Sequence, residues 1–410
     1  MKNSLTFLIL LSLLSCDVTD TFPPSDDKIN LSPYVVDTLL LSENNDYYKI
    51  DSHIIYNDLI ILTIVNNETN EGWIDCYNKK TFEKIWSWQE AMDTYGVPAK
   101  GFAKYSYLKD GILCIKQQNL SYGINADTGE TIWENRETSG QSSLKSGKSD
   151  FIGGIDYDGM WHDRYVAEAA NIYDGVWKHY YVYNREDSLR VAGGGPHPFR
   201  WKGKDYITFI TAKWGTGPHI EISWLNLYNI TDERLEWTSD TIPLYHPLSG
   251  TPGVQPEFED GQILLANDAI YSYNFEDGSL EWWKRYTNRF VFTTHLTTAN
   301  GMVYGNNEDQ FMVGLDVHTG EEIFKTDTGG SASRIVYNNG KCYMSSVTVG
   351  GSNRLMVIDG TTGAVLQSEK APFRSEDSKW TFARATAVDP ETEYVYTSDH
   401  RYLLVYDFGE

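Results

Sequence analysis

The chain has 410 residues, of which 41% are hydrophobic and 14% aromatic, a globular composition that excludes an intrinsically disordered protein. Its formal net charge of −23 argues against nucleic acid as a partner, because binding to a phosphate backbone depends on lysine and arginine side chains that release counterions. The excess of acid is interpreted as a source of solubility, with a dedicated basic partner as the alternative.

The N-terminus predicts a signal peptide over residues 1–15. Lys2 gives a short basic start, and residues 5–14 form an apolar run too short to cross a bilayer as a permanent helix. The run ends in Leu13-Leu14-Ser15-Cys16, which resembles the lipobox of bacterial lipoproteins. In that family the peptide is cut before the cysteine, which is then acylated, so the resemblance implies lipidation at Cys16. An ordinary signal peptide with an incidental cysteine is the alternative.

Residues 16–33 are expected to form the lipidated cysteine and a flexible tether. The stretch after Cys16 (DVTDTFPPSDDKIN) is polar, contains two prolines and has little to bury. We therefore expect a lipid-anchored protein of the bacterial cell envelope, with the outer membrane favoured. Asp17 matches an inner-membrane retention signal of some Gram-negative bacteria, so the membrane and its face stay open.

A repeat occupies the rest of the chain. Its clearest copy is YGINADTGETIW, residues 122–133: an apolar strand ends in Asn or Asp (position zero), followed by Thr or Asp at position three, Gly at position four and an aromatic residue at position eight. Copies spaced by 42 to 59 residues predict the four-stranded blades of a β-propeller. The expected position-zero residues are Asn78, Asn125, Asn184, Asn229, Asn274, Asp316, Asp359 and Asp407.

Each position of the repeat has a physical role. The position-zero side chain can accept hydrogen bonds from nearby amides and close a turn, and glycine tolerates the positive φ of that turn. The aromatic residue can pack a large flat surface between blades. It is Trp86, Trp133, Trp237, Trp282 and Phe324 in five copies, and it lapses to Ala192 and Gln367 in the third and seventh.

Further turn signals separate the first two strands of several blades. They are Asp110-Gly111, Asp260-Gly261, Asn300-Gly301 and Asn339-Gly340, each followed by an apolar strand. Such pairs favour tight hairpins.

The last copy decides the architecture, because the chain stops three residues after Asp407 and this blade has no outer strand of its own. Residues 34–42 (YVVDTLLLS) form a strand that belongs to no other blade. Placing it there closes the ring and removes the sheet edges. We therefore predict an all-β fold, an eight-bladed propeller of four-stranded antiparallel blades over residues 34–410, closed by an N-terminal strand. Seven blades is the alternative.

The repeat resembles the PQQ-like (quinoprotein-type) propeller repeat over roughly residues 34–408. This family includes the PQQ-dependent alcohol dehydrogenases and the BamB-like lipoproteins of outer-membrane assembly. Its dehydrogenases hold a Ca²⁺-bound quinone beneath a disulfide between adjacent cysteines, whereas no two cysteines are adjacent here and no C-x-x-C-H haem motif occurs. We expect a non-enzymatic protein without PQQ, calcium or another metal.

Three further cysteines, Cys76, Cys114 and Cys342, lie in apolar strand contexts and are expected to be buried free thiols. A Cys76–Cys114 bridge between neighbouring blades is the alternative. Gly193-Gly194-Gly195 lacks the setting of a phosphate-binding loop and is interpreted as a turn between blades.

One candidate ligand site is a ring of side chains at the mouth of the central channel. Counting back six residues from the turn glycine gives Tyr105, Gln255, His295 and Arg334, and a looser alignment adds His197 or Arg200, and Arg384. In an acidic protein such a partly cationic ring could hold an anion. A plain water-filled channel is the alternative. The candidate ligand residues are His197, Gln255, His295, Arg334 and Arg384.

A candidate partner loop lies in the third repeat, where 59 residues separate two copies. The insertion contains Tyr157, Trp161 and His162, and aromatic loops on a rigid scaffold are typical of partner contacts. In the alternative interpretation, Trp161 only covers the enlarged blade. Trp201, Trp214 and His219 form a second possible aromatic cluster.

These features predict a membrane-anchored binding scaffold that presents its loops to a protein partner, as the BamB-like resemblance implies for envelope assembly. A glycan-binding surface lipoprotein is the second hypothesis, and an enzyme with a site in the channel is the third.

Overall fold

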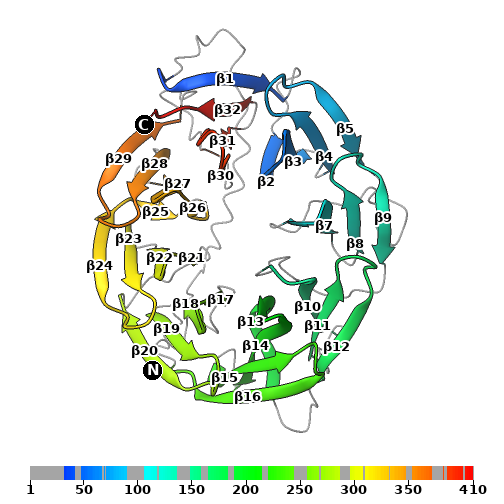
Figure 1. Cartoon of the computed structure of the whole chain (residues 1–410), viewed down its shortest axis with the longest axis vertical. Helices are drawn as coiled ribbons and strands as arrows, with labels where there is room; N and C mark the ends of the chain where they lie inside the picture. Colours follow the sequence, from blue (N-terminus) through cyan, green and yellow to red (C-terminus); the bar gives the residue numbers. More distant parts are fainter. Residues whose placement is uncertain are drawn as a thin grey trace, which may run out of the picture.

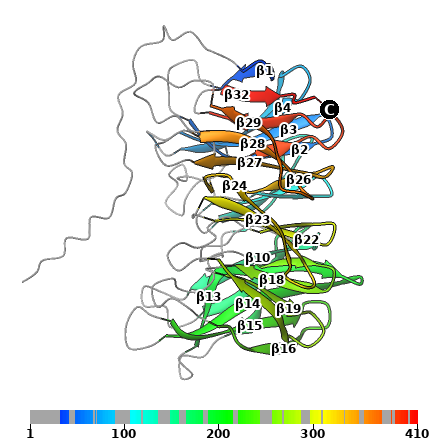
Figure 2. The same ribbon diagram turned by 90° about the vertical axis from the view of Figure 1, so that its left-hand side faces the viewer.

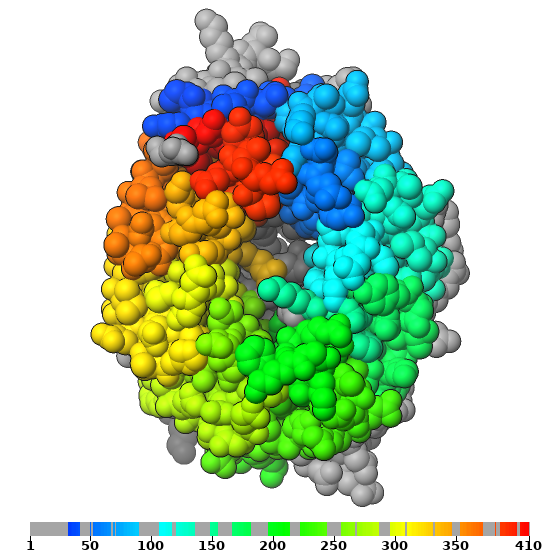
Figure 3. All heavy atoms as spheres, viewed as in Figure 1, coloured from blue at the N-terminus to red at the C-terminus, as the bar shows by residue number. Residues whose placement is uncertain are grey.

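The computed structural model is a ring of eight β-sheets around a central channel (Figure 1; Figure 3). Seen from the side, the ring of sheets forms a disc (Figure 2). The structure describes residues 32–41, 48–66, 69, 71–89, 106–117, 120–135, 148–157, 165–182, 189–214, 220–243, 256–266, 269–286, 296–307, 310–331, 333–347, 353–371, 382, 386–399 and 402–409.

The blades follow one another along the chain, and each runs from the channel outward. Blade 1 consists of β2 (Tyr48–Tyr56), β3 (Leu59–Asn66), β4 (Gly72–Asn78) and β5 (Lys84–Trp88). Blade 2 consists of β6 (Tyr107–Lys109), β7 (Ile112–Gln117), β8 (Leu120–Asn125) and β9 (Thr131–Asn135). Blade 3 shows β10 (Phe151–Tyr157), β11 (Tyr165–Asn171) and β12 (Trp177–Val182) within the described residues. Blade 4 consists of β13 (Leu189–Trp201), β14 (Lys204–Trp214), β15 (Ile220–Asn229) and β16 (Arg234–Thr241).

The second half of the ring repeats this pattern. Blade 5 consists of β17 (Glu257–Glu259), β18 (Gln262–Ala266), β19 (Ala269–Asn274) and β20 (Leu280–Arg285). Blade 6 consists of β21 (Thr297–Ala299), β22 (Met302–Asn307), β23 (Phe311–Asp316) and β24 (Glu322–Asp327). Blade 7 consists of β25 (Gly330–Ser331), β26 (Val336–Asn338), β27 (Lys341–Val347), β28 (Asn353–Asp359) and β29 (Val365–Lys370). Blade 8 consists of β30 (Thr386–Val388), β31 (Val395–Ser398), β32 (Tyr402–Tyr406) and β1 (Val35–Leu40).

The strand alternation gives the disc two different faces. The turns between first and second strands, and between third and fourth strands, lie together on one face, which we call the short-turn face. The connections between second and third strands, and those between blades, start and end on the opposite face, which we call the long-loop face.

The turns of the short-turn face follow the predicted chemistry. Asn125 Oδ1 accepts hydrogen bonds from the amides of Asp127 (2.9 Å) and Thr128 (3.1 Å), and Gly129 has φ +75°. Asp110 and Gly111 both have positive φ (50° and 76°), as a tight hairpin between twisted strands requires. The pairs at residues 260–261, 300–301 and 339–340 share this geometry, which confirms the predicted hairpins.

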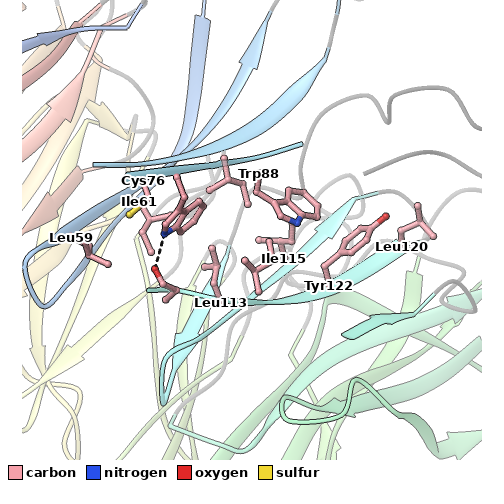
Figure 4. Packing of buried hydrophobic residues seen from close by; sticks show 12 residues of the cluster. Leu59, Ile61, Cys76, Trp88, Leu113, Ile115, Leu120 and Tyr122 are labelled. Carbon is pink, nitrogen blue, oxygen red and sulfur yellow. Dashed lines mark hydrogen bonds between the residues drawn. The ribbon is translucent and has the colours of Figure 1, made fainter. Parts of the chain in front are cut away.

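The position-eight aromatic residue joins each of five blades to the next. Trp86 lies over Gly129 of blade 2, where a methyl group built on the glycine would meet the indole at 2.7 Å. Its Nε1 donates to the carbonyl of Ala126 at 3.1 Å. We call this aromatic-on-glycine contact the aromatic clamp. Figure 4 shows the apolar interface around it, with Trp88 beside Tyr122.

The same clamp recurs in four further pairs of blades. In these blades position four is glycine for two reasons: the turn has a positive φ, and a side chain there would collide with the aromatic ring. The remaining pairs are Trp133 on Gly175, Trp237 on Gly278, Trp282 on Gly320, and Phe324 on Gly363.

The ring closes as predicted, with β1 as the outer strand of blade 8 (Figure 1). Val35 pairs with Tyr406, so Ser32, Pro33 and Tyr34 occupy positions three to five of a turn that begins at Asp407. The hydrogen bonds repeat those of the other blades. The Asp407 amide donates to the Tyr34 carbonyl (2.9 Å) as Asn125 does to Glu130. The Tyr34 amide donates to Ser32 Oγ (3.3 Å). The first and last described segments of the chain thus share one turn.

The third repeat was wrongly placed. Its turn begins at Asn171, not at Asn184, which lies outside the described residues: Asn171 Oδ1 accepts from the Tyr173 amide (2.9 Å), and Gly175 has φ +68°. The aromatic residue, Trp177, stands at position six in place of position eight, and the shift in strand pairing lies further along β11, between Ala167 and Glu168. The irregular spacing therefore precedes blade 4, and Ala192 belongs to the inner strand of that blade.

The cysteines Cys76, Cys114 and Cys342 are free and buried, as expected, and a Cys76–Cys114 bridge is ruled out. Burial raises the pKa of Cys76 and of Cys342 to about 12, and that of Cys114 further. These thiols are therefore protonated and unreactive in the folded protein.

Candidate functional site

The candidate channel residues share one position in the blades. Arg334 lies two residues before the inner strand β26 and is half-buried. His197 stands at the equivalent place in β13, six residues before Gly203, so the structure favours His197 over Arg200 in this alignment.

His197 differs from an open channel residue in its burial. Its side chain is only 1% exposed, on the side of β13 that also carries Phe199, in the core between blades 4 and 5. Gln255, His295 and Arg384 lie outside the described residues, and so does Tyr105. The ring of ligands stays a prediction, with Arg334 and His197 as its two described members.

The candidate partner loop begins at the end of blade 3. Tyr157 is the last residue of β10 and pairs with Tyr165, the first residue of β11, at the long-loop face. Trp161 and His162, between these strands, lie outside the described residues. The base of the loop is therefore placed on the long-loop face beside blade 4.

Blade 4 extends further toward the long-loop face than its neighbours. Its second strand, β14, has 11 residues, whereas β3, the next longest second strand among the described residues, has 8. Each residue adds about 3.3 Å, so β14 reaches about 10 Å further than β3. The first strand, β13, follows it with residues 189–192 paired to residues 210–213.

Residues 193–196 form a bulge that allows this extension. They lie inside β13, where the pairing with β14 shifts between Ala192 and His197, so the interpretation of Gly193-Gly194-Gly195 as a turn between blades is wrong. The Pro196 carbonyl approaches Gly153 of β10 so closely that a Cβ on Gly153 would meet it at 2.1 Å. The glycine is therefore required for blades 3 and 4 to pack.

The proposed cluster of Trp201 and Trp214 is not formed. Trp214 is the last residue of β14, whereas Trp201 pairs with Lys204 at the other end of this strand, so the two residues lie roughly 35 Å apart on opposite faces of the disc. Trp201 instead packs edge-on against Phe258 of blade 5, with ring centroids 5.0 Å apart. His219 lies outside the described residues.

A charged network joins blades 2, 3 and 4 on the short-turn face. Asp150 accepts from Lys109 and from Arg200 (2.5 Å to Nη1), and Asp205 accepts from Ser149 Oγ at 2.8 Å. Burial alone would raise the pKa of Asp150, but the two cationic donors outweigh it and hold the pKa below its usual value. The carboxylate therefore stays charged and positions the turn at residues 148–150.

Within the described residues, no group of three or more His, Cys, Asp or Glu side chains is arranged to hold a metal ion. Across the same residues, no helix has the length and apolarity needed to cross a membrane.

Comparison with known proteins supports one family. A family model described as outer membrane protein assembly factor BamB matches residues 223–409, from the third strand of blade 4 to the end of blade 8. BamB of Yersinia pestis is 21% identical over 285 residues; the match covers 65% of this chain and 66% of that protein, just under two thirds of its length.

Two solved structures share the fold. BamB from Moraxella catarrhalis aligns with a TM-score of 0.56 and 14% identity, covering 92% of this chain and 98% of that one. The computationally designed Ika8 protein aligns with a TM-score of 0.59 and 12% identity, covering 89% and 98%.

The eight blades and their repeated turn-and-clamp contacts define an all-β, eight-bladed propeller. Within that class, residues 223–409 are similar to the BamB family model, and the whole ring shares its fold with BamB from Moraxella catarrhalis.

Proposed function

We propose that this chain is a non-enzymatic scaffold of the bacterial cell envelope that binds a protein partner through the long-loop side of blades 3 and 4. The extension of blade 4 carries the proposal, because the end of β14, paired with β13 and β15, reaches further toward the long-loop face than the other described second strands. The name of the related BamB proteins, outer membrane protein assembly factor, supports a role in assembly there. Lipidation at Cys16, which lies outside the described residues, would hold the scaffold at the membrane.

The absence of enzymatic activity is part of the proposal. It rests on the sequence, which lacks the adjacent cysteines of the PQQ dehydrogenases. Addition of PQQ with Ca²⁺ should neither stabilise the protein nor produce dye reduction. A gain in thermal stability with catalytic dye reduction would refute this part and leave the scaffold role to be tested separately.

Site-specific photo-crosslinking in intact membranes tests the docking surface. A photoreactive residue replaces Lys213, which is exposed near the tip of β14, and the matched control replaces Lys370, exposed at the corresponding end of blade 7. We expect a discrete crosslinked protein from position 213 and none from position 370. Equal crosslinking from both positions, or none from position 213, would contradict the proposed surface.

Glycan binding is a second candidate function, and one observation favours it. Trp283 on the outer strand β20 is 44% exposed, and its indole stacks on Tyr271 with ring centroids 6.5 Å apart. An exposed, backed indole is a suitable platform for a sugar ring. Quenching of tryptophan fluorescence by envelope oligosaccharides, abolished in Trp283→Ala, would support it, and quenching that survives this change would refute it.

A further inference from the structure

His53 is a buried histidine on β2, the inner strand of blade 1. The residue is 8% exposed, and neither Nδ1 nor Nε2 has a hydrogen-bond partner among the described residues. A neutral imidazole can be accommodated in an apolar interface, whereas an imidazolium without a partner cannot, because burial of an unpaired charge is costly. The protonation state of His53 therefore matters to whatever interface contains it.

The strand register places this ring in the junction between blades 8 and 1. His53 pairs with Leu62, so the two side chains leave the sheet on the same side. Leu62 belongs to the apolar cluster that blade 1 shares with Ala387, Tyr396 and Leu403 of blade 8. The inner strand β2 also contacts β30 and β31 of blade 8, beside which it lies in Figure 1. His53 therefore lies where the last blade of the chain packs against the first and closes the ring.

The titratable groups around this junction are engaged with one another. Those that face it from the packed elements are Asp75, Tyr77, Lys79 and Lys84 of blade 1 and Asp37, Asp389, Glu391, Tyr394 and Tyr396 of blade 8. Asp75 accepts from Tyr77 Oη at 3.0 Å and from Lys84 Nζ at 2.7 Å. Leu62 stands between Asp75 and His53 in the sheet, so their backbones are two strand spacings, about 10 Å, apart.

Burial decides which form of His53 the closed junction accepts. It holds the pKa of this histidine at about 3, below the ordinary value of 6.5. In an open junction water reaches the ring, which then takes up its proton near the ordinary pKa. Because the pKa is lowered in the closed state, protons favour the open state at every pH below 6.5, and the stability of the closed state is lost as pH falls from 6.5 toward 3.

We propose that the closure of the ring between blades 8 and 1 is acid-sensitive, with His53 as the residue whose protonation opens it. The ion pair at the short-turn end of the same junction does not titrate in this range: burial would raise the pKa of Asp389, but Lys79 and the Glu391 amide hold it below 3.8. Opening would expose the apolar side chains of both blades, Leu62 and Leu403 among them. The acid-sensitive closure goes beyond the proposed scaffold function and does not depend on it.

Two exposed histidines show a different setting. His179 Nε2 lies 3.7 Å from Glu168, and His318 Nε2 lies 3.2 Å from Asp260, with histidine side chains that are 41% and 49% exposed. A proton on either ring meets a carboxylate and water, whereas a proton on His53 meets apolar side chains.

Thiol labelling of the full-length protein measures the opening of individual junctions. Ser398→Cys places a thiol at a buried position that pairs with Leu403 and faces blade 1. Cys342, in the apolar cluster between blades 6 and 7, is the internal reference. A pyridyl disulfide is the probe because it reacts with thiols in acid, and mass spectrometry assigns the labelled sites. Each rate is divided by that of an unfolded peptide with the same cysteine at the same pH.

The corrected labelling rate at position 398 should rise by about 30-fold between about pH 7.5 and about pH 5, the factor that the ordinary pKa of 6.5 gives for protonation of the open state. Cys342 should stay more protected than position 398 throughout. No rise at position 398 would overturn the proposal. Equal protection of the two thiols would also overturn it, because the chain would then unfold as a whole and no separate opening would occur at this junction.

His53→Phe is the matched variant, since it keeps a planar ring of similar size and removes the titrating group. Labelling at position 398 should then be independent of pH over the same range. A rise that persists in this variant would assign the acid sensitivity to another group, such as the buried His197 between blades 4 and 5, and would overturn the role of His53. His53→Leu, with a smaller side chain, provides the same test if phenylalanine does not fit.

Discussion

Replacing Lys79 by methionine should destabilise the propeller strongly, because it removes one partner of the buried ion pair at the ring closure. Asp389 is 1% exposed and receives Lys79 Nζ at 2.8 Å, so the substitution leaves a carboxylate in the interface without its counter-ion. Removal of one partner of a buried pair costs about 3–5 kcal/mol. The Glu391 amide, which still donates to Asp389 at 3.0 Å, favours the lower end of that range.

Urea denaturation followed by tryptophan fluorescence measures the loss, and two further variants serve as controls. Lys80→Met removes a neighbouring pair, Lys80–Asp58, whose side chains are 68% and 61% exposed, and should leave the transition unchanged. Lys79→Met with Asp389→Leu replaces the whole pair by apolar groups and should recover most of the stability. Equal transitions for Lys79→Met and Lys80→Met would refute the reasoning.

Three other predictions follow from single contacts. Gly129→Ala should cost more stability in urea denaturation than Gly261→Ala, by about 1–3 kcal/mol. Both glycines have positive φ but only Gly129 lies beneath an indole, so equal losses would show that φ alone decides. The pKa of Asp150 is depressed in the folded state, so its contribution to stability is present above the ordinary value of 3.8 and is lost as pH falls through the folded pKa. Asp150→Asn should therefore flatten the decline in stability below about pH 4, and an unchanged decline there would contradict this. Cys114 should react with thiol reagents only on unfolding, and rapid labelling of the native protein would show that the core opens.

The repeat was predictable because its signals are local. Asn125, Gly129 and Trp133 stand within nine residues, and each has a role that one turn and one neighbouring strand fix. The copy in blade 3 was misplaced because Asn171 and Gly175 fit the turn, but the aromatic residue does not stand at position eight. Position eight of this copy is His179, and a pattern that requires an aromatic residue there passes over the turn.

The contacts at the ring closure and the candidate sites could be predicted only in part. Lys79 and Asp389 are separated by most of the chain and meet only because the ring closes, so sequence spacing gives no sign of their contact. His197 matched the position of a channel residue, yet its side chain is buried in blade 4. The repeat predicts the position of a residue along its blade. It does not predict how exposed the side chain is, because exposure depends on the neighbouring blade.

The split turn of blade 8 allows a direct test of whether the turns of the eight blades are equivalent. Gly409 and Ser32 occupy positions two and three of one turn, so joining them directly would recreate the turn that the other blades contain without a break. A circular permutant that begins at Thr128 and ends at Asp127 moves the opening to the same position of blade 2. We expect it to fold with a similar unfolding midpoint, because every blade contact is kept.

A permutant opened inside β8, at Tyr122, is the matched control. Its new ends interrupt a third strand that is paired on both sides, so it should be severely destabilised. If the permutant opened in the turn also failed to fold, the position of the natural ends would be essential and not merely permitted. Closure by β1 would then be a required step of folding, and the equivalence of the eight turns would hold for their geometry but not for their role in assembling the ring.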